Sequence, residues 1–371
     1  MILPAIPALI AAAYYFLALI AVLTWGKPSS RSGGPGRTLP PVSILKAVHG
    51  RDPRFYEAIR SHAEQEYPEF EILFGLNTPD DPSLPDIERL RKEFPNRSIR
   101  VLTVSTDAPN AKAGVLAALA NEARSPLILV NDSDIKVEPG YLLSITRPLE
   151  DPGVGLVTCL YRAWADSWPS RAEALGVTTE FAPSVMVARL LGVGEFALGS
   201  TMLFRAEVLP RMGGFEGIAD YLADDYQLGA RIRALGYRIE FAPDVVETDL
   251  GGESWRQTWR HQVRWSRTIR VSRPGGYFGY GVTHATVWAL LAFAAGQWWA
   301  GTVALAVRMA AAIAIGGIVL RDRHVSRTFW LIPFRDLFGF AVWLAGLFGT
   351  TVQWRDRALR LNSDGKIRKS S

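Results

Sequence analysis

The chain has 371 residues, of which 49% are hydrophobic and 21% charged, and its formal net charge is +5. This length allows about two domains, and the hydrophobic share is high for a soluble enzyme. Cys159 is the single cysteine, which excludes an internal disulfide. The five histidines lack paired spacing, so the sequence has no zinc signature. Much of the positive charge flanks apolar segments, which favours a membrane surface over nucleic acid as the partner.

The N-terminal segment predicts a membrane anchor. Residues 4–25 carry no charge, and a helix of this length extends about 33 Å, enough to cross a bilayer. A cleaved signal peptide is the alternative, but the segment has no basic start and no clear cleavage site. Residues 26–39 form a predicted linker rich in Gly, Pro and Ser. Its basic residues Lys27, Arg31 and Arg37 favour the cytoplasmic side of the membrane.

The segment 40–273 has the alternating pattern of an α/β domain. Repeated β-α-β units predict a Rossmann-type, mostly parallel sheet with right-handed crossovers. Ligands of such a sheet bind beyond the carboxyl ends of its strands. We expect strands over 41–48, 70–76, 99–104 and 126–132, and helices over 53–68, 86–94, 111–123 and 221–236.

Hydrophobic segments return after the α/β domain, and we place C-terminal membrane helices within 278–352. Residues 281–300 and 301–320 predict a helical hairpin, with Trp298 and Trp299 as interfacial aromatic residues at its outer turn.

A third apolar stretch covers 329–352 and contains the charged residues Arg335 and Asp336. If it crosses the membrane, the basic tail at 353–371 lies opposite the catalytic domain, against the charge bias. The stretch is therefore either a third C-terminal span or a re-entrant or interfacial segment.

Asp132 and Asp134 stand at the end of the strand expected over 126–132. Side chains at positions i and i+2 of an extended segment point to the same side, so these carboxylates can converge. Two such charges repel unless a cation or hydrogen-bond donors lie between them. A Mg²⁺ or Mn²⁺ ion shared with substrate phosphates would meet that need. The alternative is that Asp132 caps a turn and Asp134 is solvated.

Two further segments carry charged residues at informative places. Asp224 and Asp225 open the helix expected over 221–236, where acids are also favoured for helix-dipole reasons alone. Residues 259–270 combine arginines with two tryptophans just before the C-terminal apolar region. Arginine can bind a pyrophosphate in bidentate fashion and tryptophan can stack on a sugar or lipid, although a juxtamembrane Arg/Trp belt has the same composition.

These segments, bracketed by apolar helices, resemble the ceramide glucosyltransferases and their bacterial relatives. The relatives include hopanoid-lipid glycosyltransferases, and the group belongs to the family-2-like inverting glycosyltransferases. The resemblance runs from "VSILKAVHGRDP" to "WRDRALRL" and is most specific in "DSDIKV", "GGFEGIADYLADDY" and "HQVRW". It implies a GT-A-like catalytic domain, a UDP-sugar donor and a divalent cation, Mg²⁺ or Mn²⁺.

The resemblance also implies roles for individual residues. His261 departs from the family, which has Gln or Arg at the start of the Q/R-x-x-R-W motif. The animal enzymes have Gly at the position of Asp134. The metal role of Asp134 therefore rests only on the argument that its side chain points to the same side as that of Asp132. The implied roles are uridine and ribose binding for Asp81, nucleotide binding for Asn110 and Lys112, metal and diphosphate binding for Asp132, catalytic base for Asp225, and substrate binding for Arg264 and Trp265.

We therefore predict a multi-pass enzyme of the bacterial inner membrane with a cytoplasmic catalytic domain. It would move a hexose or N-acetylhexosamine from a UDP-sugar to the hydroxyl of a ceramide- or hopanoid-type lipid, giving a β-glycoside. A processive polysaccharide synthase shares this core but would need more helices for an export channel. A non-catalytic membrane scaffold would be expected to lose the acids, which this chain retains.

Overall fold

The computed structural model describes residues 3–26, 39–193, 196–354 and 357–368. The chain divides into two compact units, and the predicted block 40–273 is shared between them. The predicted linker residues Lys27, Arg31 and Arg37 lie outside the described residues. The sheet unit comprises Gly26–Tyr161 and Glu195–Asp249, and the helical unit comprises Met1–Trp25, Arg162–Gly194 and Leu250–Arg368.

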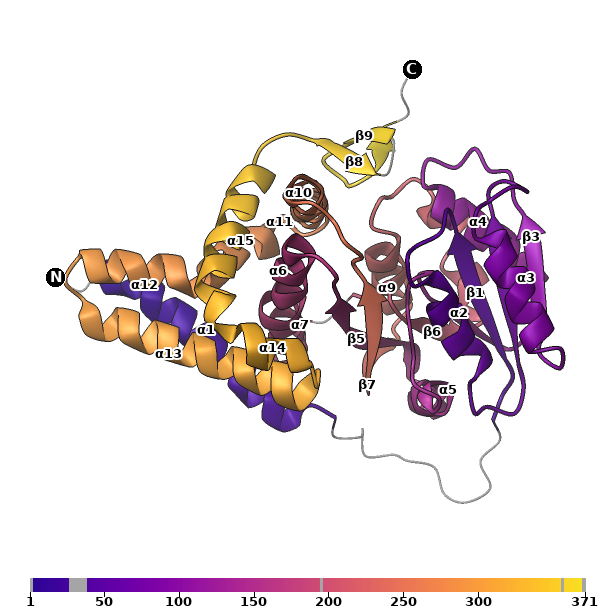
Figure 1. Cartoon of the computed structure of the whole chain (residues 1–371), viewed down its shortest axis with the longest axis horizontal. Helices are drawn as coiled ribbons and strands as arrows, with labels where there is room; N and C mark the ends of the chain where they lie inside the picture. The colour runs from indigo at the N-terminus through magenta and orange to yellow at the C-terminus, as the bar shows by residue number, and fades with distance from the viewer. Residues whose placement is uncertain (1–2, 27–38, 194–195, 355–356, 369–371) are drawn as a thin grey trace. The chain divides into compact units, whose positions relative to one another are not determined.

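The sheet unit contains a seven-stranded sheet in the order β3-β2-β1-β4-β6-β5-β7 (Figure 1). Strands β3, β2, β1 and β4 are parallel, whereas β6 runs antiparallel to both β4 and β5. The prediction of a mostly parallel α/β sheet is thus confirmed. The strands are β1 (Val42–Val48), β2 (Phe70–Leu76), β3 (Ser98–Thr103), β4 (Leu127–Val130), β5 (Val154–Trp164), β6 (Met202–Arg205) and β7 (Arg238–Asp249).

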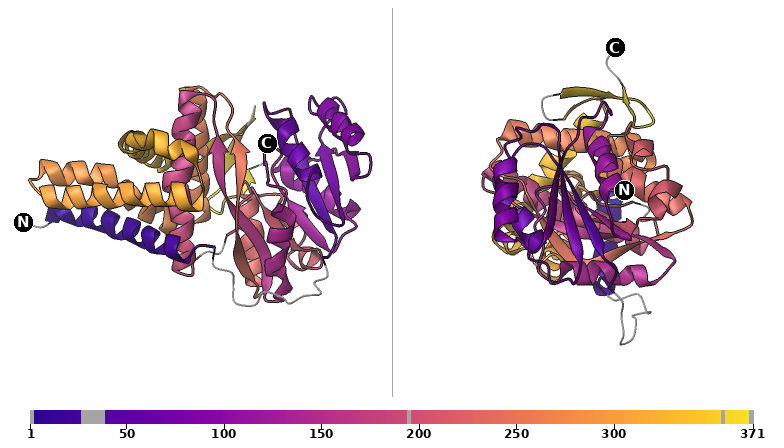
Figure 2. Two further views of the ribbon diagram at one scale, coloured as in Figure 1. Left: turned by 60° about the horizontal axis from the view of Figure 1, so that its bottom comes forward. Right: turned by 90° about the vertical axis from the view of Figure 1, so that its right-hand side faces the viewer.

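Helices cover both faces of the sheet (Figure 2, right). Successive strand residues point to opposite faces, so Ile44 joins one buried cluster with Ile59, and Leu45 joins the other with Leu116. The hydrophobic core is therefore two layers separated by the sheet. The principal helices of this unit are α2 (Phe55–Ala63), α3 (Leu84–Glu93), α4 (Ala111–Glu122), α5 (Tyr141–Thr146), α8 (Val208–Arg211) and α9 (Asp224–Ala234).

Among the described residues, three helices of the helical unit are long and apolar enough to cross a membrane: Leu3–Thr24, Trp298–Val319 and Phe329–Gly346. They match the predicted anchor, the second arm of the hairpin and the third apolar stretch. The first arm of the hairpin is the shorter helix α12 (Ala285–Ala294).

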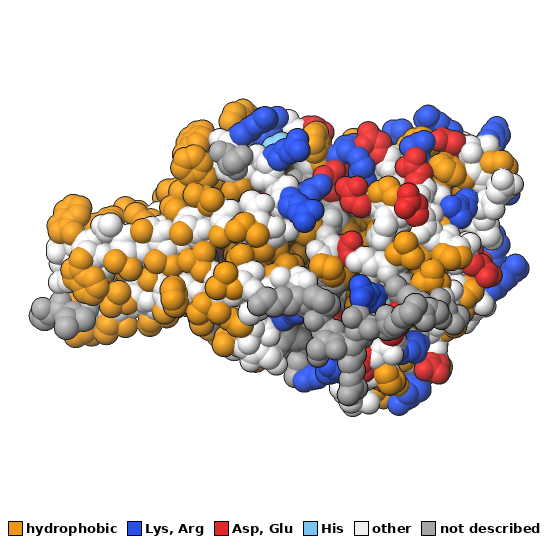
Figure 3. Space-filling model, turned by 90° about the horizontal axis from the view of Figure 1, so that it is seen from below, with side chains coloured by type: hydrophobic (Ala, Val, Ile, Leu, Met, Phe, Trp, Pro, Cys, Tyr) orange, Lys and Arg blue, Asp and Glu red, His pale blue; other side chains and the backbone are white. Residues whose placement is uncertain are grey.

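The helices α1 (Ile6–Thr24), α12 and α13 (Trp298–Ala314) lie side by side (Figures 1 and 2). Small side chains allow this close packing. Large hydrophobic side chains cover the outside of these helices, at the left end of Figure 3. The alanines between the helices are Ala5, Ala8 and Ala12 of the N-terminal segment, Ala289 and Ala292 of α12, and Ala300 and Ala304 of α13.

The helical unit also contains helices of mixed polarity and a small sheet. A π-helical turn, η3 (Val177–Phe181), joins α6 to α7, and a second, η6 (Ile315–Val319), extends α13. A three-stranded antiparallel sheet begins at Thr351, before the end of the predicted apolar stretch 329–352, and continues into the predicted basic tail. The elements are α6 (Trp168–Gly176), α7 (Ala182–Leu190), α10 (Trp255–Ser272), α11 (Pro274–Tyr280), α14 (Arg323–Thr328), α15 (Ile332–Gly346), β8 (Thr351–Trp354), β9 (Arg357–Leu361) and β10 (Ile367–Arg368).

Candidate active site

Asp132 and Asp134 lie directly after β4, at the carboxyl end of the parallel strands. The Asp132 side chain is 40% exposed, whereas Oδ2 of Asp134 accepts hydrogen bonds from the Thr248 hydroxyl and from the backbone N–H of Asp249. Desolvation and the negative charge of Asp132 raise the pKa of Asp134 to about 6. The two carboxylates are therefore close enough to repel each other, and their oxygen donors suit a hard cation such as Mg²⁺ or Mn²⁺.

Lys112 forms ion pairs with both Asp132, which follows β4, and Asp224, the first residue of α9. It lies in the first turn of α4, and its Nζ is 2.7 Å from Oδ1 of Asp132 and 3.2 Å from Oδ2 of Asp224. Although desolvation disfavours the charged ammonium, the two carboxylates hold the pKa of Lys112 above its usual value. Three sequence segments thus meet at one charged cluster.

Asp225 is the fourth member of this cluster, which we call the Lys112 cluster. Its Oδ2 accepts a 3.2 Å hydrogen bond from the backbone N–H of Gly199, and its Oδ1 accepts one of 2.7 Å from that of Tyr226. A Cβ on Gly199 would lie 3.2 Å from Oδ2 of Asp132 and 3.6 Å from Oδ2 of Asp225. The absence of a side chain at this glycine lets both carboxylates approach the same stretch of backbone.

The environment of Asp225 favours a group that exchanges a proton near neutral pH. Desolvation and the charge of Asp224 raise its pKa to about 6, against the opposing charge of Lys112. A general base works best when its pKa lies near the pH of the reaction. The role of Asp225 as catalytic base stays a prediction.

Asp81 and Asn110 lie in the same unit, and both are buried. Asp81 accepts 2.9 Å hydrogen bonds from the backbone N–H groups of Gly50 and Ser83. Asn110 caps α4 and donates a 2.8 Å hydrogen bond to the Tyr221 carbonyl, three residues before α9 begins at Asp224. Each residue therefore fixes a loop or a helix start, and nucleotide binding by these two residues stays a prediction.

Sequence reasoning missed Lys46, which is fully buried in β1. Its ammonium donates a 3.1 Å hydrogen bond to the backbone carbonyl of Asp132. Desolvation lowers its pKa to about 7, although the charges of Asp134 and Asp132 oppose the shift. A lysine inside the apolar strand "VSILKAV" was the available signal, because lysine is almost never fully buried without a partner.

Arg264 and Trp265 belong to the helical unit, where both lie on α10. The Trp265 ring contacts His261 one turn earlier, with 4.8 Å between ring centroids, and Phe181 at 6.5 Å. The "HQVRW" segment is therefore helical, and its first and last residues touch.

The family profile of glycosyl transferase family 21 matches residues 3–367. The chain belongs to this family. Ceramide glucosyltransferase 1 of Caenorhabditis elegans is 27% identical over 205 residues, which are 54% of this chain and 44% of the nematode protein. A probable glycosyltransferase of Bacillus subtilis, YdaM, is 24% identical over 62% of this chain and 56% of its own length. The chain thus matches only about half the length of these curated relatives.

A solved structure shares the fold of this chain. The mannosyltransferase PcManGT from Pyrobaculum calidifontis, in complex with GDP-Man and Mn²⁺, superimposes with a TM-score of 0.55 and 20% identity, covering 93% of this chain and 97% of that chain. The predicted resemblance to ceramide glucosyltransferases and the predicted GT-A-like fold are both confirmed.

Proposed function

We propose that the protein is a membrane-bound inverting glycosyltransferase that moves a hexose or N-acetylhexosamine from a UDP-sugar to the hydroxyl of a membrane lipid of ceramide or hopanoid type. The Lys112 cluster carries this proposal. It places a partly exposed carboxylate, Asp132, and a carboxylate with a raised pKa, Asp225, beside the same glycine at the carboxyl end of the sheet. Family membership and the candidate membrane helices support the same reading.

The proposed reaction is a single displacement at the anomeric carbon of the donor sugar. The acceptor oxygen forms a bond to that carbon while the bond between the carbon and the diphosphate oxygen of UDP breaks, and this oxygen keeps the electron pair. The proton of the acceptor hydroxyl passes to the Asp225 carboxylate. Attack from the face opposite the leaving group turns an α-linked donor into a β-glycoside. No covalent enzyme intermediate is required.

Charge on the departing diphosphate must be stabilised during this step. Asp132 and Asp134 would hold a Mg²⁺ or Mn²⁺ ion, which when bound supplies positive charge to the phosphate oxygens. Lys112, placed between Asp132 and Asp224, can turn its ammonium to the same oxygens. We assign Arg264 to the diphosphate as well, and Trp265 to the sugar or the lipid, on the family resemblance.

The acceptor is proposed to be a lipid because the unit that carries Arg264 also carries the apolar helices. UDP-sugars are made in the cytoplasm, so the sheet unit should face the cytoplasm. In a bacterium the protein would therefore lie in the inner membrane. A bilayer then brings the lipid hydroxyl to the enzyme.

The proposal is tested with the full-length protein in detergent or lipid vesicles. It is incubated with Mn²⁺ and either UDP-glucose or UDP-N-acetylglucosamine, in vesicles containing ceramide, a hopanoid alcohol or neither. A discrete glycolipid with a β-anomeric proton signal supports the proposal, and D225N should not form it. Lipid-independent polymer would indicate a polysaccharide synthase, and an α-glycoside would exclude the inverting mechanism.

A further inference from the structure

Two adjacent residues of α10, His261 and Gln262, are tied to buried carboxylates. Nδ1 of His261 lies 2.6 Å from Oε1 of Glu173, whose side chain is only 1% exposed. The second carboxylate, Glu180, belongs to the same continuous helical segment, seven residues further along. The carboxylates thus stand two turns apart beside α10.

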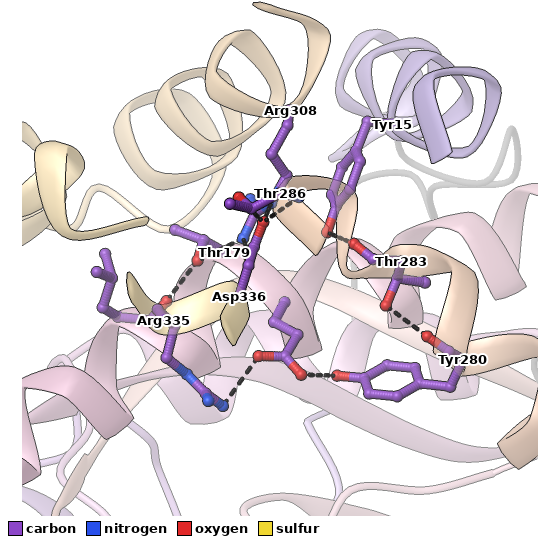
Figure 4. Close-up of polar contacts among 10 residues, drawn as sticks. Tyr15, Thr179, Tyr280, Thr283, Thr286, Arg308, Arg335 and Asp336 are labelled. Carbon is purple, nitrogen blue, oxygen red and sulfur yellow. Dashed lines mark hydrogen bonds and ion pairs between the residues drawn. The ribbon is translucent and has the colours of Figure 1, made fainter. Parts of the chain in front are cut away.

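Glu180 reaches Gln262 through an arginine of the apolar helix Phe329–Gly346. Nη2 of Arg335 lies 2.9 Å from Oε2 of Glu180 and donates a 2.9 Å hydrogen bond to Oε1 of Gln262. The Tyr280 hydroxyl donates a 2.7 Å hydrogen bond to Oε1 of Glu180 (Figure 4, which labels Arg335 and Tyr280). The buried network therefore joins a candidate membrane helix to the "HQVRW" helix.

Such an arrangement ties α10 to its neighbouring helices through directional polar contacts. A carboxylate removed from water is destabilising unless charges or hydrogen bonds satisfy it. Glu173 and Glu180 therefore require His261 and Arg335 to keep their positions. Glu180 also lies in the π-helical turn η3, a departure from regular helix that often marks functional sites.

His261 acts on the residues that follow it along the same face of α10. Residues three and four positions apart are neighbours on a helix, so His261 lies next to Arg264 and Trp265. Its ring contacts Trp265 at 4.8 Å while its Nδ1 faces Glu173. The imidazole therefore stands between a buried anchor and the indole.

A metal ion is the competing explanation, because Glu253 brings a third donor to Glu173 and His261. One donor atom from each residue lies within 4.8 Å of the others. Two ligands of a tetrahedral zinc ion would stand roughly 3.3 Å apart, given bonds of about 2.0–2.1 Å. The 2.6 Å separation of His261 Nδ1 and Glu173 Oε1 is shorter than this and is that of a direct contact between the two side chains.

We infer that His261 is a positioning residue: its contact with the buried Glu173 fixes this face of α10 and thereby the positions of the Arg264 and Trp265 side chains. Gln262 gives the same segment a second anchor through Arg335. This inference rests on the proposed function, because it assumes that Arg264 and Trp265 contact the substrates. It also explains how a histidine can stand where the resembled family has Gln or Arg, since each of these can donate to a carboxylate.

The test compares H261A and H261R in full-length protein, with H324A as the matched control. His324 is also a histidine of the helical unit that packs edge-on against a tryptophan, Trp164, at 5.7 Å. H261A should lower kcat about tenfold or more, because a misplacement of about 1 Å can cost about 100-fold in rate. The KM for the UDP-sugar should change less than about threefold. H261R should recover to within about threefold of the wild type, and H324A should match the wild type.

The double variant E173Q/H261A removes the buried charge together with its partner, so it remains informative if H261A does not fold. It should be as slow as H261A, since both changes remove one anchor. Wild-type kcat in either variant, or H261R no faster than H261A, would overturn the inference. One zinc ion per wild-type chain, lost in H261A and kept in H324A, would overturn it in favour of a metal site. Wild-type protein that binds UDP but transfers no sugar would count against the proposed function instead.

Discussion

Replacing Asp225 by Asn tests the proposed chemistry most directly. The substitution keeps the size of the side chain, and the amide oxygen can still accept the hydrogen bond from Gly199 N–H. It removes the charge that would accept the proton. Loss of general-base catalysis costs at least about 10²-fold in turnover, equivalent to about 2.7 kcal/mol of transition-state stabilisation. Affinity for the UDP-sugar should change much less, because a base acts only in the transition state.

The pH dependence gives this prediction a second readout. Asp225 must be deprotonated to accept a proton, and its pKa is raised to about 6. Wild-type kcat/KM should therefore fall as the pH drops through about 6, to roughly one-tenth at pH 5. D225N should lose the part of this fall that Asp225 causes, because its amide does not titrate, and any fall that remains would come from another group such as Asp134.

The assay is a pH series of initial rates with a radiolabelled UDP-sugar and lipid vesicles, with D224N as the matched neighbour. Asp224 points to Lys112 at 3.2 Å rather than to Gly199, so D224N should lose less turnover than D225N. An essential Asp224 with a dispensable Asp225 would assign the base to the other residue. If both are dispensable, the inverting mechanism is refuted.

Three further predictions concern the metal, the membrane helices and the topology. EDTA should abolish sugar transfer, and Mn²⁺ or Mg²⁺ should restore it. D132A should weaken UDP-sugar binding, measured calorimetrically with the metal present. Full activity of D132A in EDTA would contradict the metal site. D336N should lower the thermal unfolding temperature in detergent, because Asp336 lies 2.7 Å from the fully buried Arg308 and breaking a buried pair costs about 3–5 kcal/mol. The double variant R308M/D336L should lower this temperature less, because it leaves no unpaired charge. An unchanged unfolding temperature in D336N would refute the pairing argument. A cysteine at position 323 should resist an impermeant thiol reagent in intact cells and react after lysis, and labelling without lysis would reverse the proposed orientation.

The parallel half of the sheet could be predicted from the sequence because its signals are local. The apolar runs at β1 and β2 are bounded by turn residues, and helices with a 3.6-residue period separate them. The strand β6 has only four residues and pairs antiparallel with β4, more than seventy positions earlier in the chain. Nothing local encodes such a pairing, so the mixed half of the sheet was missed.

The candidate site follows the same division. Asp132 could be selected because an acid at a strand end is a position that a sequence displays, whereas Asp225 was chosen over Asp224 on the family resemblance. The partners that set their properties come from distant segments: Thr248 bonds Asp134 across 114 positions, and Lys46 bonds Asp132 across 86. Asp224 and Asp225 have identical chemistry in the sequence, so only the structure separates their surroundings.

The different surroundings of Asp224 and Asp225 are the strongest argument that the two acids have different roles. Asp224 is buried, and its Oδ2 lies 3.2 Å from the ammonium of Lys112, with which it forms an ion pair. Asp225 accepts hydrogen bonds from the backbone N–H groups of Gly199 and Tyr226, and its pKa is raised toward neutrality. Neighbouring acids whose environments differ in this way are suited to different roles. Asp224 can hold Lys112 in place while Asp225 exchanges the proton, and the charge on Asp224 is itself one cause of the raised pKa of Asp225.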